Sequence, residues 1–280
     1  MSDMEKKPLK PAEILDAVIG NFGGRAGGSF SKLFILAIMA GAFIAFAAQG
    51  SNMAAFNLLA APGTYGVGRA LAGFVFGTGL MLVILCGAEL FTGNNLIIAC
   101  VLDKKVTMGT MFRNWAIVII GNFIGSVLIA YMLANSGLLG SGGGLLGAVT
   151  LKIAVYKVNL SFIQAFYLGI MCNWLVCLAI WMASGADTAA GKILSCLFPI
   201  SLFVLSGFEH SVANMYYIPA GLFVKSNAVF AELAGITPEM LDSLTWGTFA
   251  VHNLVPVVLG NIVGGGIFTG MAYWYVYKKA

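Results

Sequence analysis

Charged residues are scarce in this sequence: Asp, Glu, Lys and Arg together make up only 9% of its 280 residues. A soluble domain usually carries about 25%. Because hydrophobic residues make up 60% of the chain, we expect much of the apolar surface to face lipid. The net charge of +4 is too small to indicate a nucleic-acid partner and is explained by Lys and Arg in loops beside a membrane.

Residue types that build enzyme and metal sites are also few. The five cysteines form no CxxC pair, so neither a disulfide framework nor a zinc site is indicated. Two histidines without an HExxH motif argue against a metalloprotease. No Ser–His pairing is evident, so an integral-membrane enzyme is disfavoured, and we expect no metal and no cofactor. The polar first 30 residues lack the apolar core of a signal peptide.

The chain does contain over-long apolar runs. Between Lys192 and Lys225 the only acid and imidazole are Glu209 and His210. At about 1.5 Å per residue a helix over this run would be roughly 50 Å long, whereas the hydrocarbon core of a bilayer is about 30 Å thick. We therefore predict one crossing that is broken near Gly207. Ionisable groups at membrane depth are costly and mark functional sites.

A second run, from Arg69 to Asp103, has the same excess length and contains Glu89 as its only acidic or basic residue. Its interruption is predicted at residues 86–94, Cys-Gly-Ala-Glu-Leu-Phe-Thr-Gly-Asn. Four further spans are expected at 32–49, 113–135, 161–183 and 253–277. The predicted fold class is an all-α integral membrane protein with six transmembrane helices, of which helices 2 and 5 are broken at mid-membrane.

The two ends of the chain suggest its division and orientation. Residues 1–28 are expected to form a cytoplasmic segment with an amphipathic helix on the membrane surface or over the mouth of a pore, and 29–280 the six-helix transmembrane domain. With both termini inside, eleven Lys and Arg fall on the inner side and four on the outer side, as the positive-inside rule requires. The inner ones are Lys6, Lys7, Lys10, Arg25, Lys32, Lys104, Lys105, Arg113, Lys192, Lys278 and Lys279; the outer ones are Arg69, Lys152, Lys157 and Lys225.

Three short motifs of the first half of the chain each recur once in the second half, in the same order. Leu36-Ala-Ile-Met returns as Leu168-Gly-Ile-Met, at an offset of 132. The pattern Gly-x-Glu-x-x-x-x-Asn at 87–94 returns at 207–214, and Gly-Asn-x-x-Gly at 121–125 returns at 260–264. Because three crossings are an odd number, the second copy would enter from the opposite side. Such inverted repeats place a transport site at the midplane between broken helices.

Polar residues at the two interruptions suit an anion. The exposed N-terminal ends of half-helices carry unpaired N–H groups and a positive dipole end. Thr92 near one break and His210 near the other can both donate hydrogen bonds, and the imidazole can also pass a proton. Glu89 and Glu209 are expected to face away from the lumen and accept from backbone or amide donors, with these candidate partners: Asn94, Asn122, Asn214 and Asn261.

Three further sets of residues are candidates with open interpretations. Asn173, in the middle of span 4, could orient His210 or Thr92. Lys157 belongs to a glycine-rich outer loop that also holds residues 140–144 and Lys152, and is either a solvated loop charge or an anion-attracting group at the mouth. Large apolar residues flank the breaks and are either core packing or apolar constrictions above and below His210: Phe76, Leu80, Leu90, Phe91 and Phe203.

Four segments resemble the formate–nitrite transporter family, a family of bacterial-type small-anion channels. They are Gly87-Ala-Glu-Leu-Phe-Thr92, Cys172-Asn-Trp-Leu-Val-Cys-Leu178, Ser206-Gly-Phe-Glu-His-Ser-Val-Ala-Asn214 and Gly260-Asn261. The resemblance covers the chain after about residue 25. It implies an aquaporin-like protomer, a homopentamer with one pore per protomer, and a place in the cytoplasmic (inner) membrane. The implied substrates are formate, nitrite or hydrosulfide.

The resemblance also implies roles for single residues. His210 would be the central histidine, Thr92 the threonine on the loop that interrupts helix 2, and Asn173 their hydrogen-bond partner. Lys157 would lie in the outer vestibule. The five large apolar residues named above would be the constrictions. Gly93-Asn94, after the threonine, does not select among the three anions.

Two routes across the membrane stay open at this stage. In the first, apolar rings strip water from the anion, which gains a proton near His210 and crosses as the neutral acid. In the second, the bare anion passes a protonated His210 and gives net current. A third alternative, a neutral-solute pore of aquaporin type, is disfavoured because the paired Asn-Pro-Ala motifs are absent.

Overall fold

The computed structural model describes residues 7–279, so Lys6, which the charge count places inside, lies outside the described residues. Over the described range every regular element is helical. Six helices there are long and apolar enough to cross a membrane, which confirms the predicted number. They span Phe30–Ala60, Pro62–Gly87, Met108–Asn135, Phe162–Gly185, Ala189–Ser206 and Trp246–Lys279.

Five of the six spans are regular helices over most of their length. They contain α2 (Phe30–Ala60), α3 (Tyr65–Leu82, after the 3₁₀ turn η1 at Pro62–Thr64), α6 (Met108–Asn135), α8 (Phe162–Gly185) and α9 (Ala189–Ser206). Side chains fix several of their starts: the hydroxyls of Thr107, Ser161 and Thr188 accept from the first turns of α6, α8 and α9. The first span continues to Ala60, well beyond the predicted end at Gln49.

The last span contains long stretches of π-helix. It runs through α13 (Trp246–Thr248), η4 (Phe249–Leu254), α14 (Val255–Asn261), η5 (Ile262–Met271), α15 (Ala272–Trp274) and η6 (Tyr275–Lys279), where the three η segments are π-helical. It begins at Trp246 rather than at the predicted Asn253. π-Helical turns inside α-helices are rare and frequently lie at functional sites.

Shorter helices complete the chain. After the first interruption come α4 (Phe91–Asn94) and α5 (Ile97–Leu102); after the second comes α10 (Ser211–Val224). The connection to span 6 contains α11 (Ala228–Ala234) and α12 (Pro238–Asp242). The prediction of a loop up to Lys157 was wrong: η3 (Leu138–Gly140) and a glycine turn are followed by α7 (Leu145–Val158), a helix with a largely buried surface.

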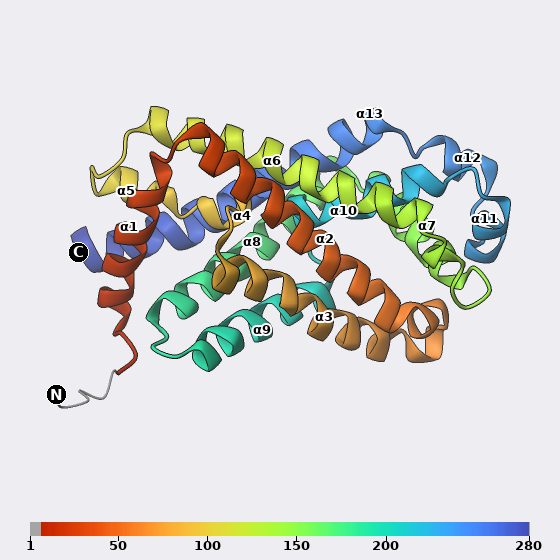
Figure 1. Ribbon diagram of the computed structural model, residues 1–280, viewed down its shortest axis with the longest axis horizontal. Helices are drawn as coiled ribbons and strands as arrows, with labels where there is room; N and C mark the ends of the chain where they lie inside the picture. Colours follow the sequence, from red (N-terminus) through yellow and green to blue (C-terminus); the bar gives the residue numbers. More distant parts are fainter. Residues whose placement is uncertain (1–6, 280) are drawn as a thin grey trace.

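The N-terminal helix α1 (Pro11–Ala26) packs on the protein. Its apolar stripe is buried, with Leu15 and Val18 fully covered and Phe22 only 4% exposed. The stripe lies against α8 and α5, rather than against a membrane surface. Figure 1 shows α1 and α5 near one end of the long axis of the molecule, and α7, α11 and α12 near the other. We call these ends the α1 side and the α7 side.

Glycines let the spans of each half approach closely. A Cβ on Gly125 would overlap the backbone carbonyl of Ile38, and a Cβ on Gly264 would overlap that of Ile170. Small residues at such crossings allow backbones of membrane helices to touch. The two crossings stand at the repeat offsets found in the sequence, so both halves of the chain use the same packing contact.

Replacing Gly264 with alanine is therefore expected to destabilise the protein by about 1–3 kcal/mol, since overpacking forces backbone shifts of that cost. Thermal unfolding of the purified protein in detergent measures the effect. Gly20→Ala is the matched control because Gly20 lies on the exposed face of α1, and an added Cβ meets nothing within 4 Å. An unchanged unfolding midpoint for Gly264→Ala would show that the two helices can separate enough to accommodate the added methyl group.

Candidate functional site

The two predicted interruptions exist, and a left-handed glycine stands at each. Gly87, at the end of the π-helical turn η2 (Val83–Gly87), has φ 81°, and Gly207, which ends α9, has φ 80°. Residues with a Cβ rarely adopt this conformation. A short extended segment follows each glycine before α4 or α10 begins. The chain thus breaks two crossings and restarts each one within a few residues.

One asparagine holds the backbone at each interruption. Asn122 on α6 accepts from the N–H of Phe91 at 2.9 Å and donates to the carbonyl of Glu89 at 2.9 Å. Asn261 at the end of α14 accepts from the N–H of Ser211 at 3.0 Å and donates to the carbonyl of Glu209 at 3.0 Å. Each amide also donates to a carbonyl of the first span of its half, at Ala37 or Gly169. These bonds satisfy backbone groups that lipid could not.

The carboxylate of Glu89 is buried and fully partnered. Its Oε1 accepts from Arg25 Nε at 2.8 Å and its Oε2 from Asn94 Nδ2 at 2.7 Å. Arg25 also donates through Nη2 to the carbonyl of Ala88 at 2.8 Å, inside the extended segment. The Asn94 amide reaches Asn114 Oδ1 at 2.8 Å as well. An unpaired carboxylate here would be costly, so these partners stabilise the interruption.

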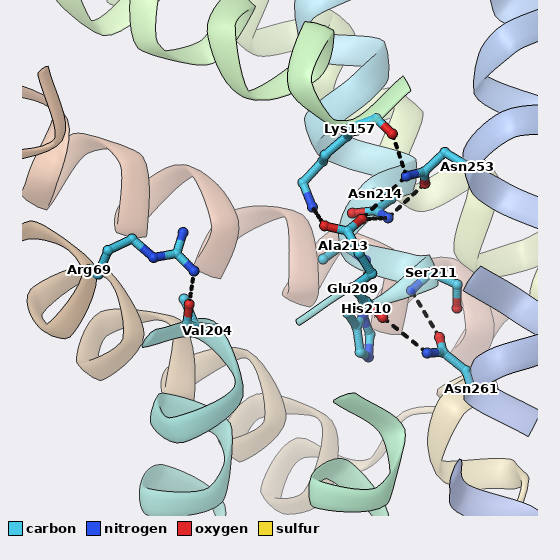
Figure 2. A network of polar contacts seen from close by, with 10 residues as sticks. All are labelled: Arg69, Lys157, Val204, Glu209, His210, Ser211, Ala213, Asn214, Asn253 and Asn261. Carbon is cyan, nitrogen blue, oxygen red and sulfur yellow. Dashed lines mark hydrogen bonds and ion pairs between the residues drawn. The ribbon is translucent and has the colours of Figure 1, made fainter. Parts of the chain in front are cut away.

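The carboxylate of Glu209 has the same kind of environment on the α7 side (Figure 2). Its Oε1 accepts from Lys157 Nζ at 2.7 Å, and its Oε2 accepts from Asn214 Nδ2 at 2.7 Å and from Asn253 Nδ2 at 3.3 Å. The interpretation of Lys157 as a solvated loop charge was wrong, because the residue is 9% exposed at the end of α7 and ion-paired. Its ammonium also lies 5.4 Å from the ring centroid of Tyr217.

Arg69, on α3, supports the end of the half-helix that precedes the second break. Its guanidinium donates to the carbonyls of Val204 and Leu205 in the last turn of α9, and Figure 2 shows the contact with Val204. The last carbonyls of a helix have no partner within it, and a cation there also complements the negative end of the helix dipole.

Thr92 and His210, from the two different breaks, meet side by side. Thr92 Oγ1 lies 3.0 Å from His210 Nε2, and His210 Nδ1 accepts from the backbone N–H of Ala213 at 3.0 Å. Because Nδ1 uses its lone pair for that bond, the neutral ring carries its proton on Nε2. Nε2–H then donates to Thr92, whose own hydroxyl hydrogen is left for a further acceptor. His210 is at once the N-cap of α10 and a donor at the meeting point of the breaks.

Asn173 contacts the loop of Thr92 rather than the histidine. Its Nδ2 lies 3.1 Å from the carbonyl of Thr92, 2.8 Å from Asn95 Oδ1 and 2.7 Å from the carbonyl of Asn261. Among the residues that the structure describes, its amide makes no hydrogen bond to His210. Asn173 therefore fixes the backbone of Thr92, and its Oδ1 is buried with no hydrogen-bond partner in residues 7–279.

Apolar side chains close around the histidine. A cavity of about 10 Å³ is lined by Ile44, Phe76, Leu80, Leu90, Val176, Ile200, Phe203 and His210. That volume is at the limit for a single water, which needs about 10–15 Å³. The Phe203 ring stacks on the imidazole at 5.8 Å between centroids, and Phe76 packs edge-on against Phe203 at 5.7 Å.

Four of the five large apolar residues expected around His210 line this cavity. The fifth, Phe91, does not: its ring packs edge-on against Trp115, with 6.1 Å between the ring centroids. Three lining residues were missed, Ile44, Val176 and Ile200, because an aliphatic residue inside an apolar span has no distinguishing signal. Asn114 and Asn253 were missed as well, although their separation of 139 equals that of Asn122 and Asn261 and marks them as a matched pair.

These features define a class: a helical membrane protein in which two interrupted crossings meet beside a narrow apolar constriction, where a histidine contacts a threonine. The sequence model described as Formate/nitrite transporter matches residues 12–275. The chain belongs to this family.

Relatives and solved structures agree with that assignment. The chain is 38% identical over 254 residues to the "Formate channel FocA" of Escherichia coli (strain K12), covering 89% of this chain and 87% of that one. It is 40% identical over 262 residues to the "Probable formate transporter" of Methanothermobacter thermautotrophicus, covering 89% of both. A solved structure described as "Pentameric formate channel with formate bound" has a TM-score of 0.78 at 38% identity, covering 89% of this chain and 98% of that chain.

Proposed function

We propose that this chain is a formate channel: a pentamer in a cytoplasmic membrane, with one pore through each protomer and both termini in the cytoplasm. The family and the relatives named for formate support the substrate, and the related pentameric structure supports the assembly. Because the relatives are channels and transporters, we propose transport without chemical conversion of the anion. The observation that carries the proposal is the Thr92–His210 pair beside a narrow apolar cavity.

The geometry suggests how the pair handles a carboxylate. Formate loses its hydration shell on reaching the apolar ring, and this penalises its charged form. When His210 Nε2–H donates to Thr92 Oγ1, the hydroxyl hydrogen of Thr92 has no acceptor among the described residues and is free to donate to a substrate. Formate would accept from that hydroxyl, so that His210 fixes the direction in which Thr92 donates.

Protonation of the anion involves both ring nitrogens. Formate would take the hydroxyl hydrogen of Thr92, and the Nε2 proton of His210 would replace it on Oγ1. The ring can give up that proton only if Nδ1 takes up another from water, because the alternative is an imidazolate. Nδ1 is held by the N–H of Ala213, so proton uptake there first breaks the cap of α10. The neutral acid would then cross, and the ring would have changed only its tautomer. Conduction of bare formate past a protonated His210 requires the same cap to break.

Proteoliposomes test the substrate directly. We expect formate to enter and swell the vesicles while glycerol does not, and the entry of formate to be accompanied by proton uptake recorded with an internal pH dye. Competition with nitrite and with hydrosulfide in the same preparation ranks the three anions. Faster uptake of hydrosulfide or nitrite than of formate would reassign the substrate within the family, and entry of glycerol would instead indicate a neutral-solute pore.

A further inference from the structure

The wall of the cavity beside His210 continues toward the α7 side as a polar surface. On α2, Ser51 stands seven residues after Ile44, which lines the cavity. On α10, Tyr217 stands seven residues after His210. Positions seven apart share a face of a helix and lie about 10 Å apart along it. The ammonium of Lys157, at the end of α7, lies 5.4 Å from the centroid of the Tyr217 ring. Ser51 and Tyr217 therefore form the next layer of the wall on the α7 side.

A third helix contributes to the same layer. Ser51 Oγ donates to the carbonyl of Ala72 on α3 at 2.8 Å. Ala72 precedes Phe76, which also lines the cavity, by one helical turn. The Tyr217 hydroxyl lies within reach of the Ser51 side chain, and Ser51 can only accept from it because its own hydrogen is already donated. Three helices that enclose the cavity thus meet again, one to two turns further toward the α7 side, around two hydroxyl groups.

Two amide groups next to these hydroxyls have unpaired donors. Gln49 and Asn52 stand three residues apart on α2 and are neighbours on its surface. Gln49 Oε1 accepts from the Tyr216 hydroxyl at 2.7 Å, and the Tyr216 ring packs edge-on against that of Tyr217 at 5.5 Å between centroids. Gln49 Nε2 and Asn52 Nδ2 are buried and have no acceptor within residues 7–279. Because a buried donor without an acceptor is costly, these groups suit a ligand that supplies acceptors.

We propose that these residues form a second binding site for the carboxylate anion, on the α7 side of the constriction. The inference rests on the proposed function. We call the site the α2–α10 cluster, and it consists of Gln49, Ser51, Asn52, Tyr216 and Tyr217. A carboxylate only accepts hydrogen bonds, and the cluster offers hydroxyl and amide donors without an acid of its own. Tyr217 is the first donor, because it shares a helix face with the central histidine, and Asn52 Nδ2 is the second. Neutral donors hold an anion weakly enough to release it, as conduction requires.

Formate flux measured from each side tests the site, in membrane vesicles of the two orientations. Tyr217→Phe removes one donor and keeps the ring. We expect it to raise the formate concentration for half-maximal flux from the α7 side about tenfold, the effect of losing one hydrogen bond to a charged group. The maximal flux should not fall, because the loss of a binding contact outside the constriction changes saturation rather than passage. From the α1 side the half-maximal concentration should stay within about twofold.

A second variant separates binding from folding. Asn52→Leu should shift the half-maximal concentration from the α7 side in the same direction as Tyr217→Phe. It should also raise the midpoint of thermal unfolding, since it removes a buried donor that has no acceptor. The matched controls are Asn57→Leu on the exposed face of α2 and Tyr167→Phe on the exposed face of α8. Both controls should leave flux from both sides at wild-type values.

Equal shifts from both sides, or a lower maximal flux at an unchanged half-maximal concentration, would overturn the second site. Wild-type values in both variants would overturn it as well, because the cluster would then hold water only. If wild-type vesicles move no formate at all, the proposed function fails instead. Calorimetric titration of the purified protein in detergent with sodium formate then judges the site alone. Binding that Tyr217→Phe weakens about tenfold supports the site, and binding that the substitution leaves unchanged, or no binding, overturns it.

Discussion

Replacing His210 with asparagine is expected to lower proton-coupled formate flux about a hundredfold or more, because a positioned proton-transfer group usually contributes at that scale. Asparagine is among the best N-cap residues, so its Oδ1 can still accept from Ala213 and keep α10 in place. It is too short to span from α10 to Thr92 and has no ring to stack on Phe203. The substitution therefore removes the donor while sparing the cap. Flux and internal pH are recorded together in proteoliposomes.

The second histidine gives the control. His252 is exposed in η4, and His252→Asn should leave flux and pH coupling at wild-type values. If His210→Asn also keeps both, the histidine has no part in moving protons. If it keeps formate flux but loses the pH signal, His210 couples protons to transport without being needed for the passage of formate.

Replacing Lys157 with methionine should destabilise the protein by about 3–5 kcal/mol, the usual effect of removing one partner of a buried ion pair. Methionine keeps much of the apolar stem of lysine, so lost packing contributes little. What remains is a buried Glu209 that still accepts from Asn214 and Asn253 but has lost its counter-charge. Thermal or denaturant unfolding in detergent measures the change.

The same substitution elsewhere on the helix is the control. Lys152 is exposed on α7, and Lys152→Met should change stability by no more than a few tenths of a kcal/mol, as expected for a surface position. The double variant Lys157→Met/Glu209→Gln should be more stable than Lys157→Met alone, because no unpaired charge is left buried. A double variant that is worse than the single one would mean that the pair is not the source of the loss.

The parts of the fold that follow from hydrophobicity could be predicted from the sequence. The lengths of the apolar runs predicted six crossings and two interruptions, one at residues 86–94 and one near Gly207. Of the four predicted asparagine partners, Asn94 and Asn214 donate to the two carboxylates, whereas Asn122 and Asn261 donate to the backbone carbonyls of the glutamates. The two cations that pair with the carboxylates were not predicted. Helix ends were less accurate, as for α2, since apolar residues continue from the bilayer into the protein surface.

The parts that depend on packing between distant segments could not be predicted. The segment of α7 is mostly apolar, but the glycine-rich turn before it and its two lysines led to the prediction of a loop. Arg25 pairs with Glu89 only because α1 packs beside the first break. The polar, basic N-terminal sequence does not predict that contact. The lining of the cavity by Ile44 and Ile200 likewise depends on how α2 and α9 meet α10.

The narrowness of the cavity beside His210 has a consequence for the pace of transport. The side-chain amides of Asn122 and Asn261 hold the backbone of the two breaks in place through hydrogen bonds, so these segments can move little. A solute larger than water can therefore get through only when the rings and branched chains around it swing aside. Turnover would then be set by rotamer jumps of Phe203 and its neighbours, which are far quicker than the hinge motions of whole helices.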